Sequence, residues 1–256
     1  MKLQGKTLLV TGSTAGIGQA MTRRFHAEGA NLVLHGLEEA QGQDLLAELG
    51  ERATLHTGDL ADPDTPQSLV ATAIETFGGI DALVNNAAAI PRATLHETDA
   101  TLFDHTMAVN ARAPLLLIQA AADTLAANQG VIVNIGSINA YCGEANLLAY
   151  SMSKGALMTL TRNLGDHLHT TLGICSYQLN LGWVLSENER RRKIHEGLPE
   201  DWHQNISREF APRGSLQTPD EIARMALPFV AGEFRPVSGS TIELEQFPVI
   251  GRNPLK

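Results

Sequence analysis

Tyr150 and Lys154 are the pair of residues in this chain whose types and spacing could do chemistry. They lie four residues apart in a stretch that favours helix, so both side chains face the same side. A lysine charge about 4 Å from a phenol is worth roughly 4 kcal/mol at an effective dielectric of about 20. That energy would lower a tyrosine pKa from about 10 to about 7, and such a phenol can exchange a proton with an alcohol. The alternative is a buried tyrosine beside a surface lysine.

A glycine-rich turn near the N-terminus supports the first interpretation. The β-prone run 7–11 leads into Gly12, Gly16 and Gly18, and residues 19–25 then have helical periodicity. Gly12 permits a tight turn, Gly16 lets a phosphate approach the backbone, and Gly18 lets the helix pack on the strand. A strand, a glycine turn and a helix N-terminus in this order predict a pyrophosphate site.

Polar residues also follow three other predicted strands at the point where each strand ends. Asp59 follows the run 53–57, Asn85 and Asn86 end the run 81–85, and Ser137 follows the apolar run 131–136. In open α/β sheets the carboxyl ends of the strands form the ligand crevice. Turn chemistry alone accounts for any one of these residues, but their joint placement favours a single site.

The elements that must position these residues alternate along the chain. Helices are predicted between β-prone runs, including 99–127 and 148–170, and the β-prone runs lie near 7–11, 31–35, 53–57, 81–85, 131–136, 174–179 and 240–244. This alternation predicts an α/β fold, a doubly wound parallel sheet of about seven strands with helices on both faces in three layers. We expect residues 1–256 to form one domain, with a charge-rich break at 186–214.

The composition limits the classes of molecule that this protein is expected to bind. The net charge of −9 and the pI of about 5.4 argue against nucleic acid or an anionic membrane. The sequence has neither a basic leader with an apolar segment nor a run of about 18 apolar residues, so we expect a cytoplasmic protein. Cys142 and Cys175 have no metal or redox spacing and are predicted to be free thiols, and no metal site is predicted.

Together these motifs resemble the short-chain dehydrogenase/reductase family, in its single-domain branch. The resemblance covers residues from 7 to about 245. The matching elements, in family order, are Thr11-Gly12-xxx-Gly16-Ile17-Gly18, Asp59, Asn85-Asn86-Ala87, Asn110, Ser137, Tyr150-xxx-Lys154 and Gly182-Trp183-Val184. The resemblance implies a Rossmann-type strand order, an NAD(P)-dependent dehydrogenase or reductase acting on an alcohol or ketone, and a homotetramer.

The resemblance also implies a role for each catalytic residue. Tyr150 would exchange a proton with the substrate oxygen, and Ser137 would hydrogen-bond the same oxygen. Lys154 would lower the pKa of Tyr150 and hold the nicotinamide ribose. Asn110, at a helix kink, would hold a water that links Lys154 to solvent. Without the other motifs, Asn110 would be interpreted as a surface helix residue.

A nicotinamide cofactor is implied along the carboxyl edge of the sheet. Asp59 would contact the adenine and Asn86 its ribose, while Val184 and Ser186 would contact the carboxamide. The residues implied to bind the cofactor are Gly12, Ser13, Thr14, Gly16, Ile17, Gly18, Gly36, Leu37, Asp59, Leu60, Asn86, Ala87, Ala88, Tyr150, Lys154, Gly182, Val184 and Ser186.

The end of the second predicted strand decides between NAD and NADP. It lacks the acid typical of NAD sites near Gly36 and the arginine typical of NADP sites near Leu37, and Ala15 is not basic. A 2′-phosphate would find no positive partner there, so the sequence favours NAD. The His35 ring could serve either cofactor.

Three positions depart from the family pattern. Ala88 replaces a glycine, Leu181 a proline and Ser186 a threonine. Ala88 matters most if its backbone needs a positive φ. The departures affect cofactor placement and the stiffness of a lid, and they remove no catalytic group.

The substrate is predicted from the polar residues expected near Ser137. The segment 186–214 would form a lid that orders on binding, and the basic run 190–193 could attract an acid, although such runs are usually solvated helix faces. Ile90 and Leu147 are apolar where 3-hydroxybutyrate dehydrogenases carry polar carboxylate contacts. We therefore expect a sugar, sugar acid or polyol. The candidate contacts are Arg92, Ser137, Asn139, Glu144 and Trp183, with Asn146 and His195 as further possibilities.

Two other functions stay open. One is NADP-dependent reduction of a 3-oxoacyl or other carbonyl compound. The other is a non-catalytic nucleotide sensor or scaffold, although such proteins usually lack the tyrosine or the lysine. The apolar segment 243–252 indicates a subunit interface, and Arg252 could reach a neighbouring active site.

Overall fold

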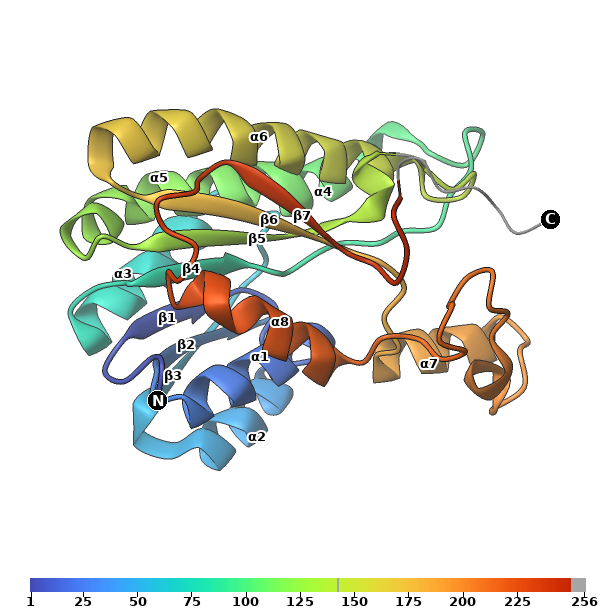
Figure 1. Ribbon diagram of the computed structural model, residues 1–256, viewed down its shortest axis with the longest axis horizontal. Coiled ribbons are helices and arrows are strands. Elements are labelled where there is room, and N and C mark those ends of the chain that lie inside the picture. Colours follow the sequence, from blue (N-terminus) through green and yellow to red (C-terminus); the bar gives the residue numbers. More distant parts are fainter. Residues whose placement is uncertain (142, 250–256) are drawn as a thin grey trace.

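A seven-stranded parallel sheet forms the centre of the molecule, in the order β3-β2-β1-β4-β5-β6-β7 (Figure 1). The computed structural model describes residues 1–141 and 143–249, so the predictions for Cys142 and Arg252 lie outside the described residues. The Rossmann-type order and the predicted strands are confirmed. The strands are β1 (Thr7–Val10), β2 (Asn31–Gly36), β3 (Ala53–Thr57), β4 (Ala82–Asn85), β5 (Val131–Ser137), β6 (Cys175–Leu181) and β7 (Ser240–Leu244).

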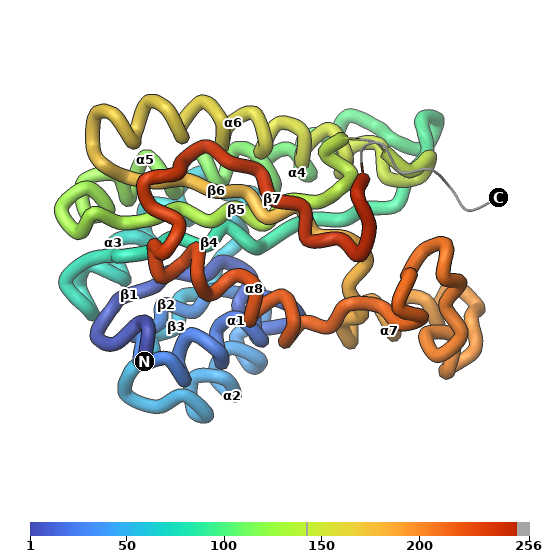
Figure 2. The backbone as a smooth tube through the Cα atoms, viewed as in Figure 1, coloured from blue at the N-terminus to red at the C-terminus, as the bar shows by residue number. Residues whose placement is uncertain are grey.

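Helices cover both faces of the sheet, which gives the predicted three layers (Figures 1 and 2). One core contains buried side chains of α1, α2 and α8, and a second contains those of α3, α5 and α6. The helices are α1 (Gly16–Ala27), α2 (Glu39–Leu49), α3 (Thr65–Phe77), α4 (Ala100–Met107), α5 (Ala113–Ala127), α6 (Leu148–Leu172), α7 (Glu187–His195) and α8 (Pro219–Val230).

The central strands are buried on both faces because helices pack on each side. Every residue of β1, β4, β5 and β6 is buried, as expected for a parallel sheet between two helix layers. Connections between parallel strands must return to the same edge, so all strands end on the side where Asn85 and Ser137 lie. The fold thereby gathers the predicted site residues at one edge of the sheet.

The prediction of one helix over 99–127 is wrong. The segment is divided into α4 and α5 by a π-helical turn, Ala108–Arg112, in which the Ala113 N–H donates to the Ala108 carbonyl. One extra residue is accommodated in this turn, and such turns are frequent at functional sites. Asn110 lies at its centre.

Strand β6 runs two residues further than predicted. Leu181 pairs with Ser137 on one side and with Leu244 on the other. The leucine that replaces the family proline retains its backbone N–H, so the strand continues to the end of its neighbour.

Segment 186–214 contains α7 and a short 3-10 helix, Trp202–Asn205, and it projects from the sheet layers at the right of Figure 1. A small cluster of Trp202, Ala211 and Leu216 holds it together. Among the described residues, no helix is long and apolar enough to cross a membrane.

Candidate active site

Tyr150 and Lys154 lie on one face of α6, beside the end of β5. The ammonium of Lys154 is 5.7 Å from the centroid of the Tyr150 ring and donates a 2.7 Å hydrogen bond to the Ile135 carbonyl. Both side chains are buried, with 9% and 2% of their surfaces exposed. The predicted pairing of phenol and ammonium on one helical face is therefore present.

The predicted fall in the pKa of Tyr150 is wrong for this structure. Burial raises the pKa of Tyr150 to about 12, more than the hydrogen bond from Ser137 lowers it, and the Glu144 charge raises it further. Burial also lowers the pKa of Lys154 to about 8. Desolvation is the largest cause for both groups because both are enclosed, and the ammonium is bonded to a carbonyl.

Ser137 ends β5, and its hydroxyl contacts both Tyr150 and Asn139. It hydrogen-bonds the phenol, and it also accepts from the Asn139 N–H and donates to Asn139 Oδ1, each at 3.2 Å. Asn139 therefore fixes the Ser137 side chain. Its own Nδ2 is buried without a hydrogen-bond partner among the described residues.

Asn110 connects the π-helical turn to two neighbouring segments. Its amide oxygen accepts from the Ala89 N–H, and its Nδ2 donates to the Ala89 carbonyl and to Ser153 Oγ, at 2.8, 2.8 and 2.9 Å. Asn110 is 1% exposed, so it is not a surface residue. All polar atoms of its side chain are bonded to protein, so any proton path through this turn would use backbone groups.

The glycine turn has the geometry that its sequence predicts. Gly12 and Gly16 have φ values of +61° and +54°, in the left-handed region that favours glycine. A Cβ on Gly18 would lie 2.1 Å from the Gly12 carbonyl oxygen, so only glycine permits this packing. Helix α1 begins after Ala15 without a side-chain cap and without an acid in its first turn, which leaves its N–H groups available to an anion.

Side chains behind the turn brace it against β2. The Ser13 hydroxyl is fully buried, donates to the His35 carbonyl and accepts from the His35 N–H. The His35 ring accepts from the Gly12 N–H through Nδ1 and contacts the Gly58 carbonyl through Nε2, at 3.2 and 3.0 Å. Both ring nitrogens therefore bind protein in this structure.

The end of β2 lacks both predicted specificity signals, and the structure shows what fills the space. A Cβ on Gly36 would lie 2.3 Å from Thr14 Oγ1, so the threonine occupies the position of a larger side chain. Leu37 is 68% exposed. Glu38 and Glu39 follow at the N-terminus of α2 and place negative charge at this end of the crevice.

Asn86 ties the end of β4 to the glycine turn. Its Nδ2 donates to the carbonyls of Thr11 and Gly12, at 2.9 and 3.1 Å, and its backbone N–H donates to Thr11 Oγ1. The Ala87 N–H also donates to Thr11 Oγ1. Ala88 has no positive φ, since Gln129 is the only such non-glycine among the described residues, and the family glycine is therefore not required there.

The residues after β3 and β6 have different surroundings. Asp59 is exposed and accepts from the Ala61 N–H at 2.8 Å, whereas Leu60 packs into the core. Gly182 packs against the end of the Glu245 side chain, whose carboxylate a Cβ at position 182 would displace. Val184 forms a bridge with Gln217, which anchors the start of the 186–214 segment.

Ser186 caps α7 instead of presenting a free hydroxyl. Its oxygen accepts from the Glu189 N–H at 3.2 Å. Ser186 nevertheless lies beside the glycine turn, since a Cβ on Gly16 would be 3.7 Å from Ser186 Cβ. Ile17 also packs against the core next to the turn.

The predicted substrate contacts form two groups. The first group surrounds Arg92. Its guanidinium donates to Asn146 Oδ1 at 3.4 Å and lies 3.8 Å from carboxylate oxygens of Glu144 and Glu196. Ser137 and Asn139 form the other, beside Tyr150. Within the part of the chain that the structure describes, no hydrogen bond or ion pair joins His195 to either group.

Trp183 precedes the projecting segment 186–214 and packs against it. Its indole N–H donates to Glu189 Oε1 at 2.8 Å, and its ring stacks on Trp202 with centroids 5.5 Å apart. The Lys193 ammonium lies 5.8 Å from the ring centroid. These contacts engage the ring with the segment, so it offers less surface to a ligand than predicted.

Several supporting residues were missed in the sequence. Thr11, Ser153 and Glu189 each hold a predicted site residue, and Glu196 contacts Arg92. Thr11 had a signal, because its hydroxyl precedes the first glycine of the turn. Ser153 and Glu196 could not be found, since their partners Asn110 and Arg92 lie in distant parts of the chain, and nothing in the sequence marked Glu189.

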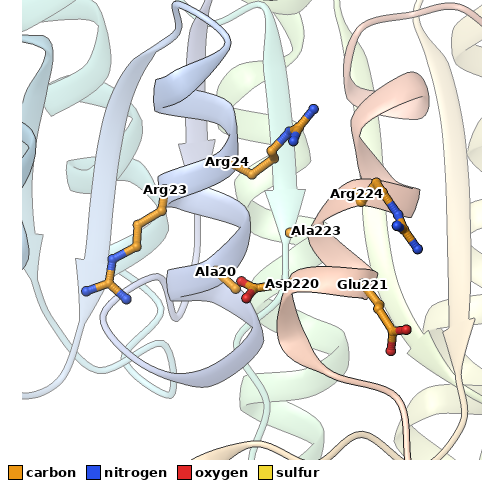
Figure 3. A pocket seen from close by; sticks show the side chains of 7 residues that line it. All are labelled: Ala20, Arg23, Arg24, Asp220, Glu221, Ala223 and Arg224. Atoms are coloured by element: carbon orange, nitrogen blue, oxygen red, sulfur yellow. The ribbon is translucent and has the colours of Figure 1, made fainter.

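A surface hollow of about 430 Å³ lies between α1 and α8 (Figure 3). Its charged side chains diverge, and Arg23, Arg24 and Glu221 are paired with Glu48, Glu28 and Arg213. They do not converge on one point, and the hollow is on a different face from Tyr150.

Comparison with known proteins gives a consistent result. Residues 6–196 match the family model described as short chain dehydrogenase. An uncharacterized oxidoreductase of Thermotoga maritima is 32% identical over 96% of this chain and 98% of its own. A solved short chain dehydrogenase/reductase family protein superposes with a TM-score of 0.84 at 30% identity, covering 96% of this chain and 98% of that one.

Relatives with named activities act on different alcohols. L-rhamnose 1-dehydrogenase (NAD(P)(+)) of a Sphingomonas species is 31% identical, over 86% of this chain and 87% of its own. Galactitol 2-dehydrogenase of Agrobacterium fabrum is 28% identical, over 89% and 91%. D-beta-hydroxybutyrate dehydrogenase of Cupriavidus necator is also 28% identical, over 93% and 95%.

Proposed function

This chain belongs to the short-chain dehydrogenase/reductase family of oxidoreductases, and from that premise we propose that it oxidises a secondary alcohol of a sugar or polyol with NAD. The observation that carries the proposal is the meeting of Ser137, Tyr150 and Lys154 where β5 ends beside α6. A phenol held by a hydroxyl and backed by an ammonium is suited to exchanging a proton with a carbinol oxygen.

Each residue has a distinct part in the proposed reaction. In the reducing direction Tyr150, which burial keeps protonated, donates its proton to the substrate oxygen. In the oxidising direction it accepts that proton. Ser137 turns its one hydroxyl proton from Asn139 Oδ1 to the substrate oxygen as negative charge develops, and the Asn139 N–H keeps the serine in place. Asn110 holds the backbone of Ala89 next to Ser153 of α6 and does not itself exchange a proton.

The residues present fit a dinucleotide. The uncapped N-terminus of α1 and the two left-handed glycines, Gly12 and Gly16, would hold the pyrophosphate. Lys154 would hold the nicotinamide ribose, while Asp59 and Asn86 would lie at the adenosine end. When bound, the nicotinamide would accept or supply the hydride at the carbon that bears the reacting oxygen.

NAD is proposed in preference to NADP because of the charge beyond β2. Glu38 and Glu39 would repel a 2′-phosphate, and the exposed side chain at position 37 is leucine rather than arginine. The competing proposal is an NADP-dependent reductase of acyl or other carbonyl compounds. The third, a non-catalytic sensor, is disfavoured because Tyr150 and Lys154 are both present.

A polyhydroxy substrate is supported by two observations. The groups near Tyr150 are amides and a carboxylate, which suit hydroxyl groups, and relatives include L-rhamnose and galactitol dehydrogenases. The hydroxybutyrate dehydrogenase relative is a weaker guide, because Ile90 and Leu147 are apolar. The proposed homotetramer rests on the family resemblance, whereas the lid over 186–214 and a cytoplasmic location rest on the sequence pattern.

The test is titration of the purified protein with NADH and NADPH, followed by cofactor-coupled screening of polyols, sugars, sugar acids and β-hydroxyacyl compounds. We expect tighter NADH binding and turnover of a polyhydroxy compound. NADPH preference together with reduction of an acyl ketone would favour the competing proposal. Nucleotide binding without turnover of any compound would favour the sensor.

A further inference from the structure

Glu144 is held close to the catalytic tyrosine by the loop that precedes α6. Its carbonyl accepts from the Leu147 N–H at 3.0 Å, and the Leu147 carbonyl accepts from the Ser151 N–H at 2.8 Å. A Cβ on Gly143 would lie 3.1 Å from Ser151 Oγ, so the loop packs directly on the first turn of α6. Tyr150 lies in that turn, and the Glu144 charge acts on its phenol.

The Glu144 carboxylate is able to accept further hydrogen bonds. Its side chain is 61% exposed, and its one ion-pair partner within the described residues is Arg92, at 3.8 Å. That guanidinium also lies 3.8 Å from Glu196 and donates to Asn146. A contact of 3.8 Å is too long for a hydrogen bond, so the carboxylate oxygens can accept from another molecule.

The basic residues nearby are engaged with acids. On α7, Arg191 pairs with Glu187 at 2.7 Å, Arg192 with Glu189 at 2.5 Å, and Lys193 with Glu196 at 3.1 Å. Arg190 lies 3.7 Å from Glu187. The basic run that could have attracted an acidic substrate is therefore balanced by carboxylates of its own helix.

We propose that Glu144 selects uncharged polyhydroxy substrates, by accepting hydrogen bonds from their hydroxyl groups and repelling carboxylates. The inference rests on the proposed dehydrogenase function and narrows its substrate class to sugars and polyols, without sugar acids. A carboxylate carried by the loop before α6, with a charge that acts on the Tyr150 phenol, favours a neutral chain rich in hydroxyl donors over an anion of the same length.

The experiment compares sorbitol with gluconate, two six-carbon chains that differ at C1 in carrying CH₂OH or a carboxylate. The ratio of kcat/KM for the two compounds is measured with NAD for the wild type and for Glu144→Gln. Glu187→Gln is the matched control, because it removes the same charge from an exposed side chain that lies on α7. The Kd for NADH, measured for all three proteins, establishes that each one is folded.

We expect the wild type to favour sorbitol. Glu144→Gln should reduce the sorbitol-to-gluconate ratio on the order of tenfold, while Glu187→Gln leaves it unchanged. A wild type that oxidises gluconate as well as sorbitol would overturn the inference and leave the dehydrogenase proposal standing. So would an unchanged ratio in Glu144→Gln. Failure to oxidise any polyhydroxy compound despite NADH binding would overturn both.

Discussion

Burial governs the acid–base chemistry of Tyr150. With a pKa of about 12, the phenol is protonated at neutral pH, and the deprotonated fraction rises about tenfold for each pH unit. Alcohol oxidation needs the deprotonated form, so its kcat/KM should rise with a slope of about one between about pH 6 and about pH 8. Above about pH 8 the slope should fall, as Lys154 loses its charge. A flat pH profile of kcat/KM for oxidation would contradict this account.

His35 makes the glycine turn sensitive to acid. Burial lowers the pKa of His35 to about 4 from an ordinary value near 6.5, and its Nδ1 accepts from the Gly12 N–H. Since the folded state binds the proton less well than the unfolded state, stability is complete above about pH 6.5 and is lost as the pH falls toward 4. From pH 7 to pH 5 the predicted loss is about 2 kcal/mol.

Urea unfolding at both pH values measures this loss. His35→Gln should remove most of the difference between pH 7 and pH 5, whereas His96→Gln, at an exposed position, should keep it. An equal pH dependence in wild type and His35→Gln would show that other groups cause it.

At the scale of single residues, the sequence predicted which side chains form the site better than it predicted what those side chains hydrogen-bond to. Tyr150, Lys154 and Ser137 meet as expected because helix periodicity and strand ends constrain them. The hydroxyls of Ser13 and Ser186 serve the protein itself, in a strand contact and a helix cap. Spacing along the chain contains no information about such partners, and it does not report the desolvation that raised the pKa of Tyr150.

At the scale of elements, a buried chain of hydrogen bonds crosses the sheet beneath α6. The chain joins side chains of β4, β5, α6 and β6 and ends at a tyrosine beyond β5. Its members, in order, are Asn85, Asn134, Thr161, Gln178, Asn180 and Tyr141, and the hydrogen bonds between them measure 2.7–3.3 Å. Periodicity predicted the strands correctly but not this chain, because polar residues inside strands were not assigned partners. The chain fixes the register between sheet and catalytic helix.

Gly136 is the residue that makes room for this chain. A Cβ there would lie 2.2 Å from Asn180 Oδ1 and 2.4 Å from Gln178 Nε2. Gly136→Ala should therefore lower the free energy of unfolding by about 2–3 kcal/mol, because buried amides lose their partners. Gly155→Ala, inside α6, is the control: its Cβ would lie 3.7 Å from the Ala140 carbonyl oxygen, an ordinary contact, and it should stabilise by about 0.5–1 kcal/mol. Equal denaturation midpoints for the two variants would contradict the prediction.

At the scale of the whole molecule, both tryptophans of the chain report on the projecting segment. Trp183 and Trp202 stack on each other, while Ser186 between them lies beside the glycine turn. Closure of this segment over bound ligands should change the intrinsic fluorescence, and Figure 1 shows how far it extends from the sheet. We expect a change on adding NADH and a second on adding a polyol, both diminished in Trp202→Phe. Unchanged emission at saturating concentrations of both ligands would contradict a lid.

The fold itself was the most predictable level. Strands that alternate with helices through short connections leave few arrangements for a parallel sheet. The family motifs then implied the strand order that the structure has. The family resemblance implied a kink at Asn110, but periodicity did not predict the π-helical turn at 108–112, because its residues have ordinary helical periodicity and the turn depends on contacts with Ala89 and Ser153.

The most direct test of the central claim compares NAD-dependent polyol oxidation by wild type and Tyr150→Phe, with NADH binding measured on both. The account predicts a loss of turnover on the order of 10²–10⁴-fold in the variant, since it lacks only the exchangeable proton, with an NADH affinity near that of the wild type. A variant that keeps its turnover would contradict the assignment of Tyr150 as the residue that exchanges the proton.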